Sequence, residues 1–200
     1  MELYCIGDSL TFGFGVRPAQ RWTTLTAGQS GWTVKAFGVC GDTAPGMLVR
    51  LRELLPTLPM RGMGKRFLLM GGSNDIFYAG SDATARASMG AMIHQLLSLG
   101  AEPIVGIPLP IAGDWYPQAW GQAVDFSEAA RMLADYEDWL EKYSRAFSLR
   151  CVDFRPDFLD GAGQLRRELY LDGLHPNEEG HRLMAARLAA FLQSLPRDEF

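Results

Sequence analysis

A serine, a histidine and an aspartate in this chain have the types and spacing needed for acyl transfer. Ser9 directly follows an apolar run and is preceded by Gly7 and Asp8. His175 comes three residues after Asp172, and in a turn this spacing lets the carboxylate reach one ring nitrogen while the other faces away. A serine hydroxyl becomes a good nucleophile only when an adjacent base takes its proton. We therefore expect Ser9, His175 and Asp172 to meet.

The other two histidines are weaker candidates for a general base. The chain has 3 histidines in all, and His94 and His181 both fall inside segments with helical periodicity. We expect each of them to be a solvated or capping side chain.

Acyl transfer also requires hydrogen-bond donors directed at the oxygen that becomes negatively charged. Gly41 offers a backbone N–H with no side chain to block approach, and Asn74 offers a side-chain amide. The backbone N–H of Ser9 is a third candidate. Asp8 and Asp75 are expected to organise their own loops.

Short apolar strands alternate with longer amphipathic segments along the whole chain, and this pattern predicts the elements that must position these residues. The predicted strands are 2–7, 32–37, 66–71, 102–107 and 149–154. Several are nearly continuous apolar runs, as in strands covered on both faces. Predicted helices lie near 18–29, 44–56 and 82–99, and two further apolar stripes lie within 132–147 and 183–195. The alternation predicts a three-layer α/β/α domain with a mostly parallel sheet.

Ligands of such sheets gather at the carboxyl ends of the strands. The segments that follow the predicted strands, or precede the last helix, are rich in small, polar and titratable residues: Gly7–Leu10, Gly38–Asp42, Gly71–Asp75, 108–127 and Asp172–Pro176. The candidate residues therefore converge on one edge of the sheet.

Four of these blocks together resemble the SGNH hydrolases, also called GDSL esterases/lipases. The blocks are Gly7–Asp8–Ser9–Leu10, Gly41–Asp42–Thr43, Gly72–Ser73–Asn74–Asp75 and Asp172–Gly173–Leu174–His175. They occur in the family's order, and the resemblance extends over essentially the whole chain, 1–200. We therefore expect one domain.

The resemblance implies Ser9 as nucleophile, His175 as base and then acid, and Asp172 as its orienting partner. It further implies an oxyanion hole made by the N–H groups of Ser9 and Gly41 and by Asn74. A flavodoxin-like sheet of five parallel strands and a reaction without metal or cofactor also follow from it. The run Arg50–Leu55 resembles the thioesterase/lysophospholipase branch less specifically.

The resemblance implies an esterase for carboxylic esters or thioesters of short to medium acyl chains. A carbohydrate acetylesterase is the alternative, because Trp115, Tyr116 and Trp120 in the fourth loop either pack on the domain or line an acyl or sugar pocket. A flavodoxin-like module that binds a ligand without cleaving it is the non-enzymatic alternative. Segment 154–171 is expected to form another pocket wall.

Composition excludes several other classes. The 200 residues are 48% hydrophobic and 21% charged, as in globular domains, and a net charge of -4 without Lys/Arg runs argues against nucleic-acid binding. No apolar stretch is long enough to span a bilayer, and the start of the chain lacks the pattern of a signal peptide, so we expect a cytoplasmic protein. The oligomeric state cannot be predicted from the sequence.

The cysteines give no support for a disulfide framework or a zinc site. There are 3 of them, Cys5, Cys40 and Cys151, with no CxxC pair. Cys5 and Cys151 are expected to be buried thiols. Cys40 lies just before Gly41, where it would narrow the site or make it sensitive to thiol reagents.

Overall fold

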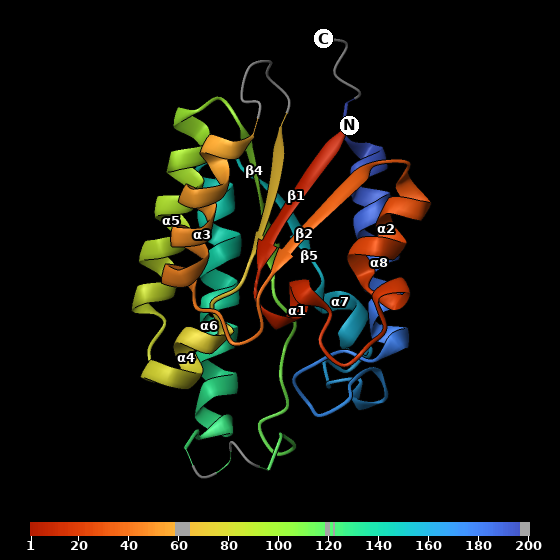
Figure 1. Cartoon of the computed structure of the whole chain (residues 1–200). Coiled ribbons are helices and arrows are strands. Elements are labelled where there is room, and N and C mark those ends of the chain that lie inside the picture. The colour runs from red at the N-terminus through yellow and green to blue at the C-terminus, as the bar shows by residue number, and fades with distance from the viewer. Residues whose placement is uncertain (59–64, 119–120, 122, 197–200) are drawn as a thin grey trace.

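The structure is a computed structural model of the chain, and it describes residues 1–58, 65–118, 121 and 123–196. Its centre is a five-stranded parallel sheet in the order β2-β1-β3-β4-β5 (Figure 1). The strands are β1 (Glu2–Gly7), β2 (Thr33–Gly38), β3 (Arg66–Met70), β4 (Glu102–Ile107) and β5 (Arg150–Asp153). This strand order is that of flavodoxin-like folds, so the predicted fold class is confirmed.

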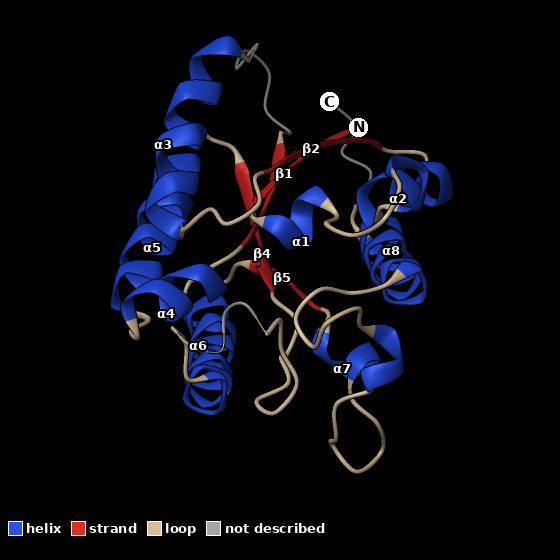
Figure 2. Ribbon diagram, turned by 60° about the horizontal axis from the view of Figure 1, so that its bottom comes forward, coloured by secondary structure: helices blue, strands red, loops and turns tan. Residues whose placement is uncertain are grey.

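Helices cover both faces of the sheet (Figures 1 and 2). One layer contains α3 (Ala44–Leu54), α4 (Ser73–Ala79), α5 (Ala83–Ser98) and α6 (Phe126–Ala146). The other contains α2 (Trp22–Ser30), α7 (Arg155–Phe158) and α8 (Glu178–Ser194). The short helix α1 (Ser9–Phe12) lies between the two layers, directly after β1 (Figure 2). Short 3-10 turns occur at Pro18–Gln20, Leu55–Thr57 and Arg167–Leu169.

The strand sequences explain the two cores. Successive side chains of a strand point to opposite faces, so a central strand must be apolar on both. In β3, Phe67 and Leu69 pack into the core under α3, α5 and α6, whereas Leu68 and Met70 pack into the core under α2 and α8. All four are fully buried. Each contributes roughly 1.5–3 kcal/mol through burial, so the sheet is held from both sides.

The observed strands lie within one residue of the predicted boundaries, and the long helices correspond to the predicted ones. Three short helices, α1, α4 and α7, were not predicted as helices. Each is 4–7 residues long, which is too short to establish a periodicity in the sequence. No helix of the described residues is long and apolar enough to cross a membrane.

Candidate active site

The candidate nucleophile lies at a tight junction between β1 and α1. Asp8 caps α1, because its Oδ1 accepts a hydrogen bond from the Leu10 N–H at 2.9 Å. Ser9 is the first helical residue and is only 9% exposed. A Cβ at Gly7 would lie 2.1 Å from Thr11 Oγ1 and 2.5 Å from the Met70 carbonyl oxygen. Only glycine fits at that position, so the sequence Gly7–Asp8–Ser9 fixes where the hydroxyl emerges.

A chain of hydrogen bonds joins Ser9 to the loop before α8. Nε2 of His175 lies 3.1 Å from Ser9 Oγ, and Nδ1 of the same ring lies 2.8 Å from Asp172 Oδ2. The other carboxylate oxygen of Asp172 accepts hydrogen bonds from the N–H groups of Leu174 and His175 at 3.1 and 2.8 Å. The structure thus brings together the three residues that the sequence singled out.

The loop geometry keeps Asp172 ionised beside the imidazole. Burial raises the pKa of the Asp172 carboxyl, but the hydrogen bonds from the side chain and backbone of His175 outweigh burial, and the pKa is lowered overall. Gly173 adopts φ 79°, and a Cβ there would lie 1.9 Å from the Trp115 carbonyl oxygen. The Phe14 ring lies 4.5 Å from the imidazole, centroid to centroid, and covers one side of it. A buried, oriented imidazole with a carboxylate partner is suited to accept a proton.

The candidate oxyanion donors lie on the two loops that follow β2 and β3. Asn74, at the start of α4, donates a hydrogen bond from Nδ2 to the Asp42 carbonyl oxygen at 2.8 Å. Its amide is therefore next to the Gly41–Asp42 segment. Gly41 has φ 75°, which glycine adopts at little cost. Because β1 pairs with both β2 and β3 in register, with Gly7 opposite Gly38 and Met70, these loops flank the start of α1.

Comparison with known proteins gives the family. Residues 5–183 match the model of the GDSL-like Lipase/Acylhydrolase family. The chain belongs to this family of acylhydrolases. The match spans most of the chain and includes all four motif blocks, so the resemblance seen in the sequence is confirmed. The comparison with curated proteins returned no match.

Solved structures share the GDSL-like acylhydrolase fold over nearly their full length. A member of the lipolytic protein G-D-S-L family from Veillonella parvula is 23% identical with a TM-score of 0.83, covering 98% of this chain and 100% of that one. An aryl esterase from M. smegmatis is 21% identical with a TM-score of 0.75, covering 98% and 99%. A carbohydrate acetylesterase from Sinorhizobium meliloti is 19% identical with a TM-score of 0.75, also covering 98% and 99%. At these identities the likeness establishes the fold alone.

One residue of this acylhydrolase whose role the motifs did not indicate is Arg50 on α3. Its guanidinium donates hydrogen bonds to Asp42 Oδ2 at 2.7 Å, to the Phe37 carbonyl oxygen at 2.7 Å and to the Gly7 carbonyl oxygen at 2.8 Å. These acceptors belong to the end of β1, the end of β2 and the loop that carries Gly41. Arg50 therefore fixes the relative positions of the nucleophile strand and the candidate oxyanion loop.

Two buried aspartates next to the motifs have raised pKa values. Burial raises the pKa of Asp8 to about 6, and one of its carboxylate oxygens is buried without a hydrogen-bond partner in the described part of the chain. Burial also raises the pKa of Asp75. Asp75 was expected to organise its own loop, but its partners lie on other segments. It accepts hydrogen bonds from Ala44 N–H at 2.8 Å and from Thr84 Oγ1 at 3.0 Å. It thus joins α4 to the starts of α3 and α5.

The other two histidines were expected to be solvated or capping side chains, and the structure gives each of them one of these two roles. His94 is exposed, with Nε2 2.9 Å from the Tyr143 hydroxyl. His181 is fully buried rather than solvated, and it caps α2 by accepting a hydrogen bond from the Trp22 N–H at Nδ1, 3.2 Å away. Burial lowers its pKa to about 4, so it stays neutral at physiological pH.

The predicted pocket walls are only partly what the sequence suggested. Trp115 packs against the core beneath α2 and α8, and Tyr116 stacks on Phe126 at 4.3 Å and lines a hollow of about 420 Å³. Trp120 lies outside the described residues. Within 154–171, Phe154 and Phe158 are fully buried core residues, so this segment is a support for the His175 loop rather than a pocket wall.

The three cysteines differ in their exposure to solvent. Cys5 is buried, Cys151 is partly buried and Cys40 is exposed, all three as free thiols.

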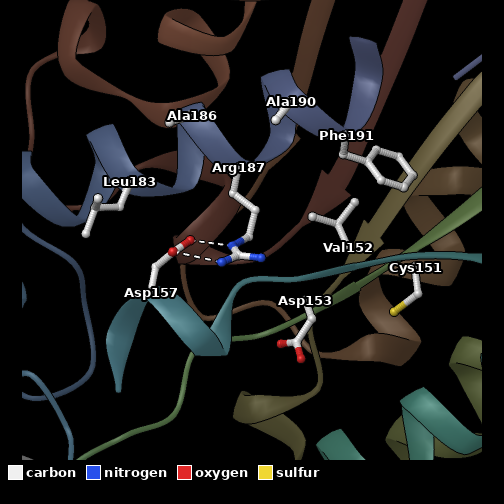
Figure 3. A pocket seen from close by; sticks show the side chains of 9 residues that line it. All are labelled: Cys151, Val152, Asp153, Asp157, Leu183, Ala186, Arg187, Ala190 and Phe191. Carbon is white, nitrogen blue, oxygen red and sulfur yellow. Dashed lines mark hydrogen bonds and ion pairs between the residues drawn. The ribbon is translucent and has the colours of Figure 1, made fainter. Parts of the chain in front are cut away.

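A hollow of about 460 Å³ lies between β5 and α8 (Figure 3). Its walls include Val152, Phe191 and the paired side chains of Arg187 and Asp157, and they contain none of the motif residues. It is therefore separate from the candidate active site.

Proposed function

We propose that this acylhydrolase is a serine esterase that hydrolyses carboxylic esters or thioesters of short to medium acyl chains through an acyl-enzyme intermediate. The observation that carries the proposal is the continuous hydrogen-bond chain from Ser9 Oγ through His175 to Asp172, at 3.1 and 2.8 Å. Family membership and the fold support it.

In the first half-reaction, His175 Nε2 takes the Ser9 proton as Ser9 Oγ attacks the carbonyl carbon. Asp172 stabilises the imidazolium that forms and holds the ring in the tautomer that this transfer needs. The carbonyl oxygen becomes negatively charged and is bound by the N–H groups of Ser9 and Gly41 and by the Asn74 amide. When the carbon–oxygen or carbon–sulfur bond breaks, His175 returns the proton to the leaving alcohol or thiol.

In the second half-reaction, a water molecule takes the place that the alcohol or thiol has left and attacks the acyl-enzyme. His175 removes a proton from the water, the hydroxide attacks the acyl-enzyme carbonyl, and the same donors bind the second oxyanion. Collapse of this intermediate releases the carboxylic acid, and the proton on His175 returns to Ser9 Oγ. No step needs a group beyond these side chains, the backbone donors and water.

The test is turnover of p-nitrophenyl acetate and butyrate by Ser9→Ala. We expect kcat to fall by several orders of magnitude, about 10³ or more, with unchanged thermal unfolding, because the nucleophile is lost and its surroundings are not. Ser98→Ala is the matched control, since this serine is exposed and donates a hydrogen bond to the Gln95 carbonyl oxygen of its own helix. Activity of Ser9→Ala close to that of the control would overturn the proposal.

A carbohydrate acetylesterase is the second candidate. The observation that favours it is the hollow of about 420 Å³ lined by Tyr116, whose ring stacks on Phe126. The walls of this hollow contain none of the motif residues, but an aromatic ring is a stacking surface for a sugar ring, and one fold neighbour is a carbohydrate acetylesterase. Rates on acetylated sugars and on a series of acyl esters of increasing length distinguish the candidates: a lipid-directed enzyme gains rate with chain length, and an acetylesterase does not.

A further inference from the structure

Arg21 directs its side chain toward the helix that carries the candidate nucleophile. It directly precedes α2, and its guanidinium carbon lies 4.3 Å from the centroid of the Phe12 ring. The stem of the side chain occupies the space beside Gly13, where a Cβ would lie 2.5 Å from Arg21 Cγ. Phe12 is three residues after Ser9 on the same helix, so the two lie about one turn apart on the same side of α1. The guanidinium therefore lies against the side chain one turn after Ser9.

The charge of Arg21 also acts on Cys40, which directly precedes the candidate oxyanion donor Gly41. Burial raises the pKa of the Cys40 thiol, and the positive charge of Arg21 opposes that rise. Cys40 directly precedes Gly41, so the charge of Arg21 acts on the loop that carries a candidate oxyanion donor. Phe12 and Phe14, which flank this region, are 39% and 45% exposed. Phe12 lies against the guanidinium and Phe14 lies 4.5 Å from the His175 ring, centroid to centroid, so exposed apolar side chains contact both groups.

Arg21 differs from the other arginines near the site in having no acceptor. Arg50, for example, is paired with the carboxylate of Asp42. Across the residues that the structure describes, no hydrogen bond or ion pair holds the Arg21 guanidinium, and its Nε is buried without a partner. Arg21 as a whole is half-buried, and an unpaired guanidinium that solvent reaches can form charge-assisted hydrogen bonds with an anion.

We propose that Arg21 is a specificity-determining residue that binds an anionic oxygen group, such as a carboxylate, on the ester substrate. This inference rests on the proposed esterase function and specifies its substrate class. The preferred esters carry the anion on one half, separated from the scissile carbonyl by an apolar segment that lies on Phe12 and Phe14. The anion forms charge-assisted hydrogen bonds with the guanidinium while Ser9 attacks the carbonyl.

The test compares Arg21→Gln with the wild-type enzyme on two matched ester pairs. One pair places the charge on the alcohol half: p-acetoxybenzoate and its neutral amide, p-acetoxybenzamide. The other places it on the acyl half: the p-nitrophenyl half-ester of adipic acid and p-nitrophenyl hexanoate. Arg17→Gln is the control, because Arg17 is an exposed cation four residues earlier and its loss changes the net charge equally.

We expect Arg21→Gln to lower kcat/KM for at least one anionic ester by about tenfold or more, the loss typical of a charge-assisted hydrogen bond. The neutral partner of that pair should change by less than about twofold, and added salt should reduce the wild-type preference for the anion. Arg17→Gln should leave both members of each pair unchanged.

Two results would overturn the inference. An equal loss of kcat/KM on anionic and neutral esters would show that Arg21 has a purely structural role through Phe12. An unchanged kcat/KM on every ester would show that Arg21 has no role in specificity. Binding of p-acetoxybenzoate to Ser9→Ala, with and without Arg21→Gln, provides a readout that does not depend on turnover, and equal affinity would also contradict the inference. Hydrolysis of the neutral esters tests the proposed function separately.

Discussion

Arg50 and Gly7 are joined by a hydrogen bond of 2.8 Å from the guanidinium to the carbonyl oxygen two residues before Ser9. The same guanidinium binds Asp42, the residue after Gly41. One side chain thus links the strand that carries the candidate nucleophile to the loop that carries a candidate oxyanion donor. In such sites a small displacement of one donor is enough to reduce transition-state stabilisation.

We therefore predict that Arg50→Gln lowers kcat for p-nitrophenyl acetate by about ten- to a hundredfold, with a smaller change in KM. The reason is that the Gly41 N–H loses its fixed position relative to Ser9. Arg52→Gln is the matched control, because Arg52 is exposed on the same helix and donates a hydrogen bond to Gln95 at 3.4 Å. Equal effects of the two substitutions would contradict this role for Arg50.

Asp172 should be essential for turnover but not for folding. We predict that Asp172→Asn lowers kcat by about 10²–10⁴, since an amide donates where the carboxylate accepts and so favours the wrong tautomer of His175. Stability should fall only modestly, because the amide oxygen can still accept hydrogen bonds from the Leu174 and His175 N–H groups. Steady-state kinetics with thermal unfolding checks both expectations, and Asp135→Asn, at an exposed position on α6, is the control.

His181 should make the fold sensitive to acid. Its pKa is lowered by burial to about 4 in the folded state, whereas an unfolded histidine titrates near 6.5. The unfolded chain therefore takes up a proton first as pH falls, and the folded state loses stability between about 6.5 and 4. The two values correspond to a loss of roughly 3 kcal/mol, fully expressed below about pH 4.

The measurement is the free energy of unfolding as a function of pH for the wild type, His181→Gln and the exposed control His94→Gln. A glutamine can still accept the hydrogen bond from Trp22 but does not titrate, so His181→Gln should show a shallower decline below pH 6.5. His94→Gln should follow the wild type. Parallel curves for all three proteins would show that His181 does not control this range.

Asp8 should act in the opposite direction over a neighbouring range. Burial raises its pKa to about 6, above an unfolded value near 3.8. The unfolded carboxyl loses its proton first as pH rises, so this group costs the folded state stability between about pH 4 and 6, at most roughly 3 kcal/mol. Asp8→Asn keeps a good helix cap and removes the charge. We predict that the variant gains stability relative to the wild type above pH 6, and that the gain vanishes below pH 4.

Parts of the structure that follow from a local sequence pattern are predicted well, and parts without such a pattern are not. The central strands were predicted to within one residue because runs such as Phe67–Met70 must be apolar on both faces. The positions of Ser9, Asp172 and His175 followed from motif blocks at the ends of elements. The sequence pattern does not predict helix α4, because seven residues with buried Ser73 and Asn74 have no helical periodicity.

Other features depend on tertiary contacts that no local pattern contains. The role of Arg50 arises from acceptors on three separate segments, and that of Arg21 from an approach to Phe12 across a loop. The sequence predicts Phe154 and Phe158 at a pocket wall, yet they fill the core beneath α8. Apolar residues near a functional loop look alike in sequence whether they line a pocket or support it.

The most direct measurement of the central claim is covalent labelling with a fluorophosphonate, followed by peptide mapping. The account predicts one adduct per chain, on Ser9, with labelling abolished in Ser9→Ala and strongly slowed in His175→Ala, because the imidazole at 3.1 Å activates the hydroxyl. An unlabelled Ser9 in protein that hydrolyses p-nitrophenyl esters, or an adduct on another residue such as Cys40, would contradict it.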